Sequence, residues 1–215
     1  YFRRIIKYNV NIYCMLDFGK EQRRYHEFAK YLHPVGFAHH MRPKSVEMLF
    51  RSIGFINIRN ANVLEVGCGQ GYLVNHFLFA KAKHVIGTEI KQQILDTIPE
   101  GAFSMYLPKQ TVQFKLEPFE DTDPNMRVDI ISIFIGNIRI IKKAIEMFEN
   151  NRYTKILAFM VPSRDFNPTR KKLDLLCERN NWSLTEFPIH LSVSGEQRRT
   201  IVLKKYVPLI DLSSG

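Results

Sequence analysis

The sequence predicts an α/β protein built on a doubly wound, mostly parallel seven-stranded sheet, with a C-terminal antiparallel hairpin and a basic, partly helical N-terminal extension. Two observations predict this class. From residue 45 onward, short apolar runs alternate with amphipathic stretches, a pattern typical of a parallel sheet covered by helices on both faces. The last amphipathic stretch is followed by two β-prone runs joined by a short polar turn, which predicts the hairpin.

The bulk properties suit one domain with a sizeable core. The chain has 215 residues, of which 45% are hydrophobic, enough to bury a large apolar interior. No internal repeat or low-complexity tract interrupts it. We expect a basic and aromatic extension over residues 1–44, a single domain over 45–207 and a tail over 208–215.

The first elements can be placed in order. Pro43 suits the first turn of a helix over residues 44–53, whose apolar side chains recur at helical spacing and which Gly54 would end. A buried strand over 62–66, an amphipathic helix over 72–82 and a second strand over 84–88 follow. Three further pairs complete the pattern; their predicted ranges are helix 91–98 and strand 111–116, strand 128–135 and helix 140–150, strand 155–161 and helix 169–179. Strands over 182–191 and 199–206 form the hairpin.

A glycine-rich turn separates the first strand from its helix. The acid Glu65 is followed by Gly67, Gly69 and Gly71, spaced two apart. Glycines at such a turn let backbone N–H groups and a helix N-terminus approach a ligand without a Cβ in the way. The second strand ends in Glu89, eighteen residues after Gly71, where an acid can bind a ribose diol. The two strands therefore predict a nucleoside-binding unit.

The glycine spacing separates two kinds of nucleoside ligand. A dinucleotide fold would place its third glycine at position 72, which is Tyr72. The G-x-G-x-G pattern opened by Glu65 instead resembles the first motif of class I S-adenosylmethionine (SAM) methyltransferases, and the resemblance covers roughly residues 45–205. It implies SAM as the cofactor and a doubly wound fold with an antiparallel closing pair. It also implies a cofactor site, which would comprise Glu65, Gly67, Cys68, Gly69, Gly71, Tyr72, Glu89 and Ile90.

The same resemblance assigns roles beyond the glycine turn. Glu117 and Phe119, after the third predicted strand, would border the adenine of the cofactor. Gly136 and Asn137 follow the fourth predicted strand, and strand carboxyl ends are where ligands lie in open α/β sheets. Gly136 would belong to the cofactor site, and Asn137 would position the methyl acceptor as the catalytic residue.

The charge of the chain points to a polyanionic partner. Lysine and arginine total 31 against 21 acids, a net charge of +10, which favours phosphate neutralisation. In the N-terminal extension the cations alternate with aromatic residues, as suits single-stranded nucleic acid, and Arg198, Arg199, Lys204 and Lys205 lie on the hairpin. The residues that we expect to bind substrate are Arg3, Arg4, Arg23, Arg24, Arg164, Arg170 and Lys171.

The cysteines, the histidines and the apolar runs indicate which other functions the sequence disfavours. Cys14, Cys68 and Cys177 lack C-x-x-C spacing, which indicates a reducing compartment without a zinc site, and Cys68 would fill space in its turn. Adjacent histidines at 39 and 40 point apart without a supporting acid, so we expect no metal. No apolar run is long enough to span a bilayer. We expect an intracellular protein without membrane contact, in the cytoplasm, nucleus or mitochondrial matrix.

Three methyltransferase groups offer partial resemblances. The rRNA adenine dimethyltransferases are similar at residues 39–42 and at Gly136 and Asn137, although their Leu-Pro-Tyr continuation is absent. The bacterial tRNA adenine-N1 methyltransferases are similar from residue 128 to the hairpin. The non-SET histone lysine methyltransferases are similar at residues 42–46 and 87–90. A ribose 2′-O enzyme fits less well. The enzymes of that group have an Asp at the end of the fourth strand and a Glu at the start of the last, and here those places hold Gly136-Asn137 and Arg199-Thr200.

These observations favour a SAM-dependent methyltransferase that acts on a polyanionic macromolecule. A base nitrogen of RNA is the first expected acceptor, and a lysine of a chromatin protein, reached through a nucleosome or a basic tail, is the alternative. A third reading is an inactive SAM-binding scaffold that works with a protein partner. These readings differ in substrate but share one cofactor site.

Overall fold

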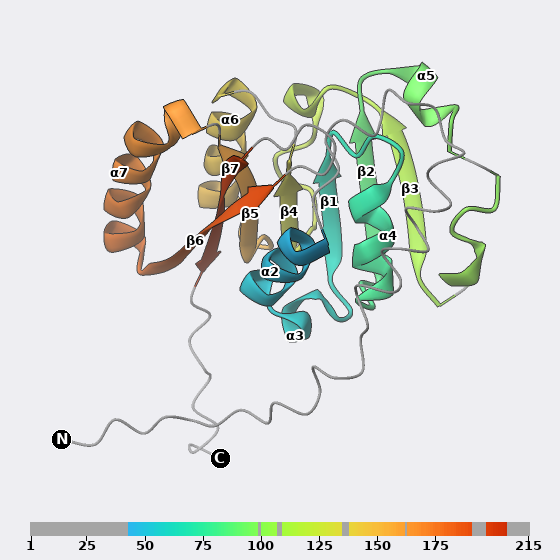
Figure 1. Ribbon diagram of the computed structural model, residues 1–215, viewed down its shortest axis with the longest axis horizontal. Helices are drawn as coiled ribbons and strands as arrows, with labels where there is room; N and C mark the ends of the chain where they lie inside the picture. Colours follow the sequence, from blue (N-terminus) through green and yellow to red (C-terminus); the bar gives the residue numbers. More distant parts are fainter. Residues whose placement is uncertain are drawn as a thin grey trace, which may run out of the picture.

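The structure, a computed structural model, describes residues 43–98, 100–106, 109–134, 138–161, 163–190 and 197–205. Seven strands form one sheet in the order β3-β2-β1-β4-β5-β7-β6 (Figure 1). The strands are β1 Asn62–Val66, β2 His84–Glu89, β3 Thr111–Leu116, β4 Ile130–Ile133, β5 Ile156–Val161, β6 Trp182–His190 and β7 Gln197–Lys205.

The sheet is parallel except at its closing pair. β1, β2, β3, β4 and β5 run parallel to one another, whereas β7 is antiparallel to both β5 and β6. The predicted fold class is therefore confirmed: an α/β protein with a mixed seven-stranded sheet and an antiparallel C-terminal hairpin. All five parallel strands end at one edge, which is where the glycine turn after β1 and Glu89 of β2 lie.

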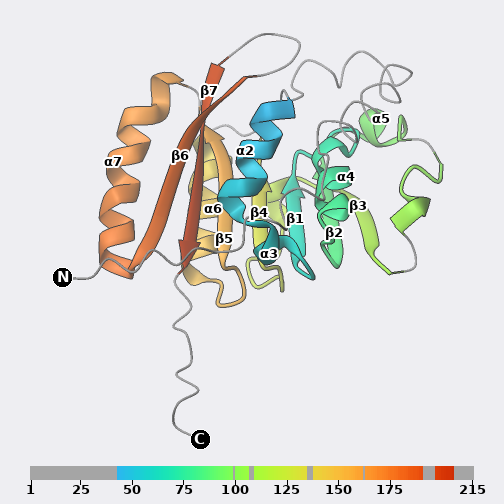
Figure 2. The same ribbon diagram turned by 60° about the horizontal axis from the view of Figure 1, so that its bottom comes forward.

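Helices cover both faces of the sheet, as Figures 1 and 2 show. One face is covered by α2 and α4, and the other by α6 and α7. The helices are α2 Pro43–Ile53, α3 Phe55–Ile58, α4 Tyr72–Phe79, α5 Gln92–Leu95, α6 Ile138–Asn150 and α7 Ser163–Asn180, with short 3₁₀ turns η3 Ser104–Tyr106 and η4 Phe119–Asp121. This arrangement is the doubly wound architecture that the alternating pattern predicts.

Each face of the sheet has its own apolar core. Phe50 of α2 and Phe77 of α4 are fully buried on one side, with ring centroids 4.9 Å apart. On the other side Phe148 of α6 packs with Phe159 of β5 in the second cluster. Because β4 and β5 are buried on both faces, β5 is a continuous apolar run in the sequence and β4 is interrupted only by Ser132.

Four predicted helices have boundaries that differ from those of the structure. The helix predicted over 72–82 ends at Phe79, and the one predicted over 140–150 begins at Ile138. The helix predicted over 169–179 begins six residues earlier, at Ser163, and runs through Pro168. Phe166 packs against the second core cluster, and this contact stabilises turns that Pro168 would otherwise disfavour. The helix predicted over 91–98 is limited to α5, because the Thr97 hydroxyl donates to the carbonyl of Ile94 at 2.6 Å and Pro99 disfavours helix in the residue before it.

Two searches of the described residues bear on other functions. No helix among them is long and apolar enough to cross a membrane. Within the same residues, no group of three or more histidine, cysteine or acidic side chains could hold a metal ion. The histidines at 39 and 40 lie outside the described part of the chain.

Candidate functional site

The turn between β1 and α4 depends on its glycines. Gly67, Gly69 and Gly71 have φ values of 67°, 54° and 81°, in the left-handed region that side chains disfavour. Gly71 is also the N-cap residue of α4, where no side chain caps the helix. A Cβ on Gly71 would lie 2.7 Å from Cζ of Phe103. The spacing of glycines in the sequence therefore reflects both backbone conformation and close packing.

The turn is attached to β2 by a backbone hydrogen bond. The N–H of Cys68 donates to the carbonyl of Thr88 at 2.9 Å, and the N–H of Gly71 donates to the carbonyl of Cys68 at 2.9 Å. The Cys68 side chain is buried and faces Gly87, where an added Cβ would lie 2.8 Å from Sγ. Burial, reinforced by the charges of Glu65 and Glu89, raises the pKa of the Cys68 thiol. A thiol of this kind fills space and is no nucleophile.

Glu89 joins the second strand to the glycine turn. Its Oε2 accepts a hydrogen bond from the N–H of Gly69 at 3.2 Å. Its Oε1 accepts from the N–H groups of Ile90 at 2.8 Å and Lys91 at 3.2 Å. The side chain is 7% exposed. An acid held in this way presents acceptor oxygens at the edge of the sheet, where hydroxyl groups of a ligand can donate to them.

Glu65 is a buried acid directly before the turn. It is 2% exposed, and among the described residues its Oε2 has no hydrogen-bond partner. Desolvation raises its pKa well above the ordinary value, and the neighbouring Ser132 of β4 partly offsets that effect. A buried carboxyl oxygen without a partner costs free energy unless a ligand or a proton satisfies it. Glu65 therefore suits a cationic or hydrogen-donating ligand group.

The space beside Gly69 is open. A Cβ built on Gly69 would meet no atom within 4 Å, in contrast to the crowded positions Gly71 and Gly87. The open position lies next to the backbone N–H that donates to Glu89. Steric crowding thus closes the turn on its inner side and leaves its outer side accessible to a ligand.

The end of β3 borders the same edge. Leu116 is in register with Glu89, and the N–H of Glu117 donates to the carbonyl of Glu89 at 3.1 Å. Glu117 also accepts a hydrogen bond from the Thr122 hydroxyl at 3.2 Å. Phe119 is 2% exposed and belongs to the second core cluster, with Nζ of Lys143 5.6 Å from its ring centre. Exposed apolar surface here comes instead from Ile90, 67% exposed, and Leu116, 51% exposed.

The remaining predicted site residues fall into two groups: first those that the structure describes, and second those outside the described residues. Tyr72 is buried at the start of α4, and its ring packs edge-on against His76 at 5.0 Å. The others in the first group, which the structure places on α7, are considered below. Those in the second group lie outside the described residues; they are Gly136, Asn137, Arg3, Arg4, Arg23 and Arg24.

The predicted substrate residues on α7 differ in their environments. Arg170 is bound by two carboxylates: its Nε lies 2.8 Å from Oδ1 of Asp174, and its guanidinium also pairs with Glu186 of β6. Its positive charge is therefore compensated within the fold. Lys171 is exposed on the same helix. Arg164 belongs to the first turn of α7.

Sequence reasoning missed several residues at this site. Ser132 faces Glu65 from the neighbouring strand, and Phe103 and Phe114 pack against the turn with ring centroids 5.5 Å apart. Leu116 reaches the site only through its register with Glu89. The one available signal was the position of Leu116 at the end of a predicted strand, because strand ends collect at this edge.

Sequence comparison finds two groups of relatives. No protein-family model matches the chain. Ribosomal protein L11 methyltransferase of Pseudomonas fluorescens is 36% identical over 70 residues, covering 28% of this chain and 24% of that protein. Ribosomal RNA small subunit methyltransferase A of Mesomycoplasma hyopneumoniae is 27% identical over 127 residues, covering 56% of this chain and 48% of that protein. The matches thus span less than half the length of either relative.

Comparison with solved structures supports the fold over most of the chain. A candidate RNA methyltransferase from Pyrococcus horikoshii has a TM-score of 0.60 at 16% identity, covering 87% of this chain and 100% of that one. Magnesium protoporphyrin IX methyltransferase from Synechocystis, solved with bound SAM, has a TM-score of 0.57 at 12% identity, covering 87% and 91%. The chain has the class I SAM-dependent methyltransferase fold, and its distant relatives include rRNA and L11 methyltransferases.

Proposed function

We propose that this chain binds SAM at the carboxyl edge of the sheet and transfers its methyl group to a base nitrogen of RNA. The observation that carries the proposal is the hydrogen bond from the Gly69 N–H to Glu89, which joins the glycine turn to the acid at the end of β2. That pairing occurs at the edge where open α/β sheets bind ligands. The fold and both relatives are consistent with methyl transfer.

The residues at this edge fit SAM by their chemistry. The unpartnered Oε2 of Glu65 suits the ammonium group of the cofactor, and Glu89 suits the hydroxyls of its ribose. The open position beside Gly69 leaves room for the cofactor next to the turn. Ile90 and Leu116 offer apolar contact for adenine, and Glu117 offers an acceptor for its amino group. When bound, SAM supplies an electrophilic methyl group on a sulfonium.

The chain would contribute chiefly by alignment and electrostatics. Methyl transfer is an in-line displacement, so positioning the acceptor nitrogen matters more than acid or base chemistry. Glu89 and the backbone of the turn would hold the ligand in a fixed place, because three backbone N–H groups orient the carboxylate. We assign Asn137, with Gly136, to the acceptor side of the site, since both follow β4 in the chain.

RNA is the favoured acceptor because of charge and of one relative. The net charge of +10 suits a polyanion, and the relative that covers the larger share of this chain is named as an rRNA methyltransferase. We propose that cations of the extension, Arg3, Arg4, Arg23 and Arg24, with Arg164 and Lys171, contact phosphates. Arg170 is a weaker candidate for binding phosphate than the sequence alone suggested, because Asp174 and Glu186 already bind it. An RNA substrate also implies an intracellular location.

A protein acceptor is the second candidate. The relative with the higher identity is named as a methyltransferase of ribosomal protein L11, which favours a protein acceptor. We propose a lysine amine as the acceptor group in that case, in a chromatin or a ribosomal protein. A SAM-binding scaffold that acts with a protein partner is the third. Each candidate uses the same cofactor site, so they differ only in which product becomes labelled.

A transfer assay with radiolabelled SAM separates these candidates. The protein is incubated with a cell extract and labelled SAM, and the product is divided between nuclease and protease treatment. We expect label that nuclease removes and protease leaves. The Glu89→Ala variant is the negative control, and Glu120→Ala, which removes an exposed acid from the same edge, should behave like the wild type.

The other outcomes are equally specific. Label that only protease removes would replace RNA by a protein acceptor. Absence of label, together with SAM binding measured separately, would leave the scaffold as the remaining candidate. Equal labelling by wild type and Glu89→Ala would contradict the placement of the cofactor.

A further inference from the structure

The opposite edge of the sheet, where the parallel strands begin, concentrates positive charge. We call the amino edge the five segments 59–62, 81–84, 127–129, 151–155 and 204–205. These segments hold eight lysine or arginine residues and a single acid, Asp129. The cations are Arg59, Lys81, Lys83, Arg127, Arg152, Lys155, Lys204 and Lys205. Six of the eight are exposed, and Lys204 and Lys205 are half-buried.

Backbone hydrogen bonds hold these segments side by side. Each of the five segments forms a backbone hydrogen bond with the next segment along the edge. The cations therefore form one continuous row, although they are far apart in the sequence. The donor and acceptor pairs, each at 2.8 or 2.9 Å, are Asn60 to Lys81, Lys83 to Ala61, Asp129 to Asn62, Lys155 to Asp129 and Lys205 to Lys155.

The one acid of the amino edge already has partners. Oδ2 of Asp129 accepts a hydrogen bond from the N–H of Asn62 at 2.9 Å. Oδ1 of Asp129 lies 3.4 Å from Nζ of Lys155. Asp129 therefore compensates one cation and leaves the rest of the row as a field of like charge, which favours an anion at this surface.

Two arginines share one tyrosine at the rim. The guanidinium groups of Arg127 and Arg152 lie 5.1 Å and 4.9 Å from the ring centre of Tyr153. Nη2 of Arg152 also donates to the Tyr153 hydroxyl at 2.7 Å, and this bond lowers the pKa of Tyr153. The two guanidinium groups on this ring carry like charges, and an anion between or beside them would offset their repulsion. Arginine with an aromatic ring is also the combination that binds single-stranded nucleic acid.

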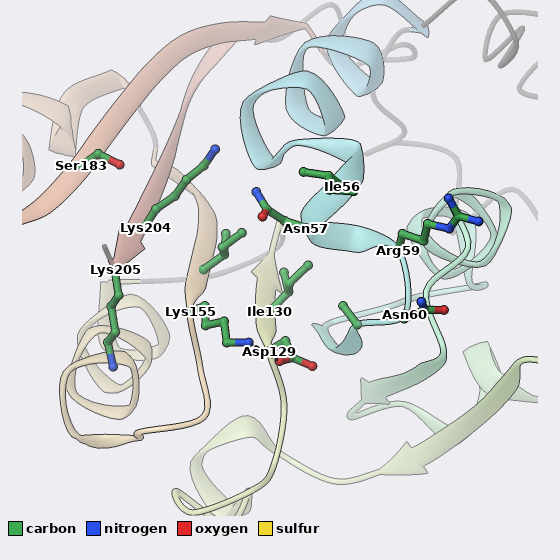
Figure 3. Close-up of a pocket in the computed structure, with 12 residues that line it drawn as sticks. Ile56, Asn57, Arg59, Asn60, Asp129, Ile130, Lys155, Ser183, Lys204 and Lys205 are labelled. Atoms are coloured by element: carbon green, nitrogen blue, oxygen red, sulfur yellow. Dashed lines mark ion pairs between the residues drawn. The ribbon is translucent and has the colours of Figure 1, made fainter. Parts of the chain in front are cut away.

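A cavity of about 440 Å³ opens at the amino edge, between α3 and the strands (Figure 3). Asp129 and Lys155 line it, two and three residues along the chain from Arg127 and Arg152. Ile130 and Ile156 line it as apolar groups, and Asn57 and Ser183 line it as polar groups. Figure 3 shows Lys204 extending along the cavity toward Asn57. Burial lowers the pKa of Lys204, an effect that a bound anion would offset. The volume lies in the range that small-ligand sites occupy.

Lys205 and Lys155 are already used by the fold. Nζ of Lys205 donates to the carbonyl of Asn151 at 2.8 Å and lies 4.8 Å from the ring centre of Phe148, and Lys155 pairs with Asp129. Lys205 also lines the cavity, and Figure 3 shows its side chain extending away from that of Lys204. Lys204 and Arg59, which line the cavity, and Arg127 and Arg152 beside it are therefore the cations with which a ligand would pair.

We propose that the amino edge binds a phosphate-bearing nucleotide, with the nucleotide in the cavity beside Lys204 and phosphate against Arg127 and Arg152. The nucleotide can be a unit of an RNA chain or a free mononucleotide. β1 is five residues long, so this site lies about 17 Å along the strand direction from the carboxyl edge. It is a second site, and its existence does not depend on methyl transfer at the other edge.

The test compares two double variants that each lose two positive charges, one at the amino edge and the other on α6 and α7. The test variant is Arg152→Gln with Lys204→Gln; the control is Lys142→Gln with Lys172→Gln, two exposed lysines of α6 and α7. Binding of a labelled single-stranded RNA is measured by fluorescence anisotropy across a range of salt, and binding of AMP by calorimetry. We expect the test variant to bind RNA about tenfold more weakly, with a salt slope smaller by roughly 1.4 for two lost phosphate contacts. The control should match the wild type, and thermal unfolding checks that both variants are folded.

Each outcome decides the proposal. Loss of AMP binding in the test variant alone, without RNA binding by the wild type, supports the site and assigns it to a free nucleotide. Equal losses in the test and control variants would mean that only net charge matters and would overturn the site. A wild-type protein that binds neither RNA nor AMP would also overturn it, whether or not it binds SAM.

Discussion

At the scale of single residues, two acids and three glycines carry the cofactor proposal. The glycine spacing predicted a turn that side chains disfavour, and all three glycines have positive φ. Glu89 was predicted from its place at the end of the second strand, and it is bound to the N–H of Gly69. Glu65 was predicted from its place before the turn. What the sequence could not indicate is that Glu65 is buried without a partner for Oε2.

The burial of Glu65 predicts a stability effect that depends on pH. Its folded-state pKa is raised by desolvation, so the folded protein binds this proton more tightly than the unfolded chain. The contribution of Glu65 to the free energy of unfolding is therefore at its full value below the unfolded pKa of about 4.3. It declines as pH rises toward the folded pKa. Glu65→Gln cannot ionise. Without SAM, the variant should be more stable than wild type at neutral pH, and the gain should shrink toward pH ~4.

Thermal unfolding at several pH values measures this difference. The same Glu65→Gln variant should bind SAM about tenfold more weakly, because a neutral amide cannot form a charge-assisted bond to the ammonium group. A variant that is less stable than the wild type at neutral pH, by an amount that shrinks as pH falls below about 4, would instead mean that the carboxylate of Glu65 is ionised and paired in the free protein.

Ser132 and Leu116 mark the limit of residue-level prediction. Neither residue type signals a ligand, and each reaches the site through register with Glu65 or Glu89 on a neighbouring strand. Register between strands distant in the sequence depends on the packing of the whole sheet. Phe119 shows the converse: its position after β3 suggested a ligand contact, whereas its side chain belongs to the core.

At the scale of elements, the fit of β2 against the glycine turn is tight. A Cβ on Gly87 would lie 2.8 Å from Sγ and 3.0 Å from Cβ of Cys68, and 3.1 Å from Cδ1 of Phe114. Gly87→Ala should therefore destabilise the fold by about 1–3 kcal/mol through overpacking. Combination with Cys68→Ala removes the nearest atom and should restore part of the loss.

A double-mutant cycle by denaturant unfolding measures the coupling between Gly87 and Cys68. Neighbouring residues that clash show a coupling free energy of about 0.5 kcal/mol or more. Strictly additive effects of the two substitutions would contradict the contact, because they would mean that the turn moves away from β2 at no cost.

Element boundaries were predictable where burial dominates the pattern. The strand predicted over 111–116 coincides with β3, and the predicted strand at 62–66 coincides with β1. The start of α7 was not predictable, because Pro168 is a local signal against helix that the packing of Phe166 overrides. The end of α5 was not predictable either, because the hydrogen bond from the Thr97 hydroxyl to the carbonyl of Ile94 leaves no periodic pattern in the sequence.

At the scale of the whole molecule, the strand order organises charge as well as ligands. The sequence predicted a doubly wound, mostly parallel seven-stranded sheet with an antiparallel closing pair, which is confirmed, and the structure adds the strand order β3-β2-β1-β4-β5-β7-β6. This order collects at the amino edge eight cations that lie between residues 59 and 205. Apart from the pair Lys204 and Lys205 on the hairpin, no local run of lysine or arginine marks this row, so the sequence did not predict it. The cations that the sequence indicated as substrate-binding lie elsewhere: four in the extension, outside the described residues, and Arg164, Arg170 and Lys171 on α7.

A calorimetric titration of SAM into the wild type, Glu89→Ala and Glu120→Ala tests the cofactor site most directly. The account predicts that wild type and Glu120→Ala bind with equal affinity. Glu89→Ala should raise the dissociation constant tenfold or more, because a charge-assisted hydrogen bond contributes about 1.5–3 kcal/mol. Equal affinity in all three proteins, or no binding to the wild type, would contradict a SAM site at the carboxyl edge.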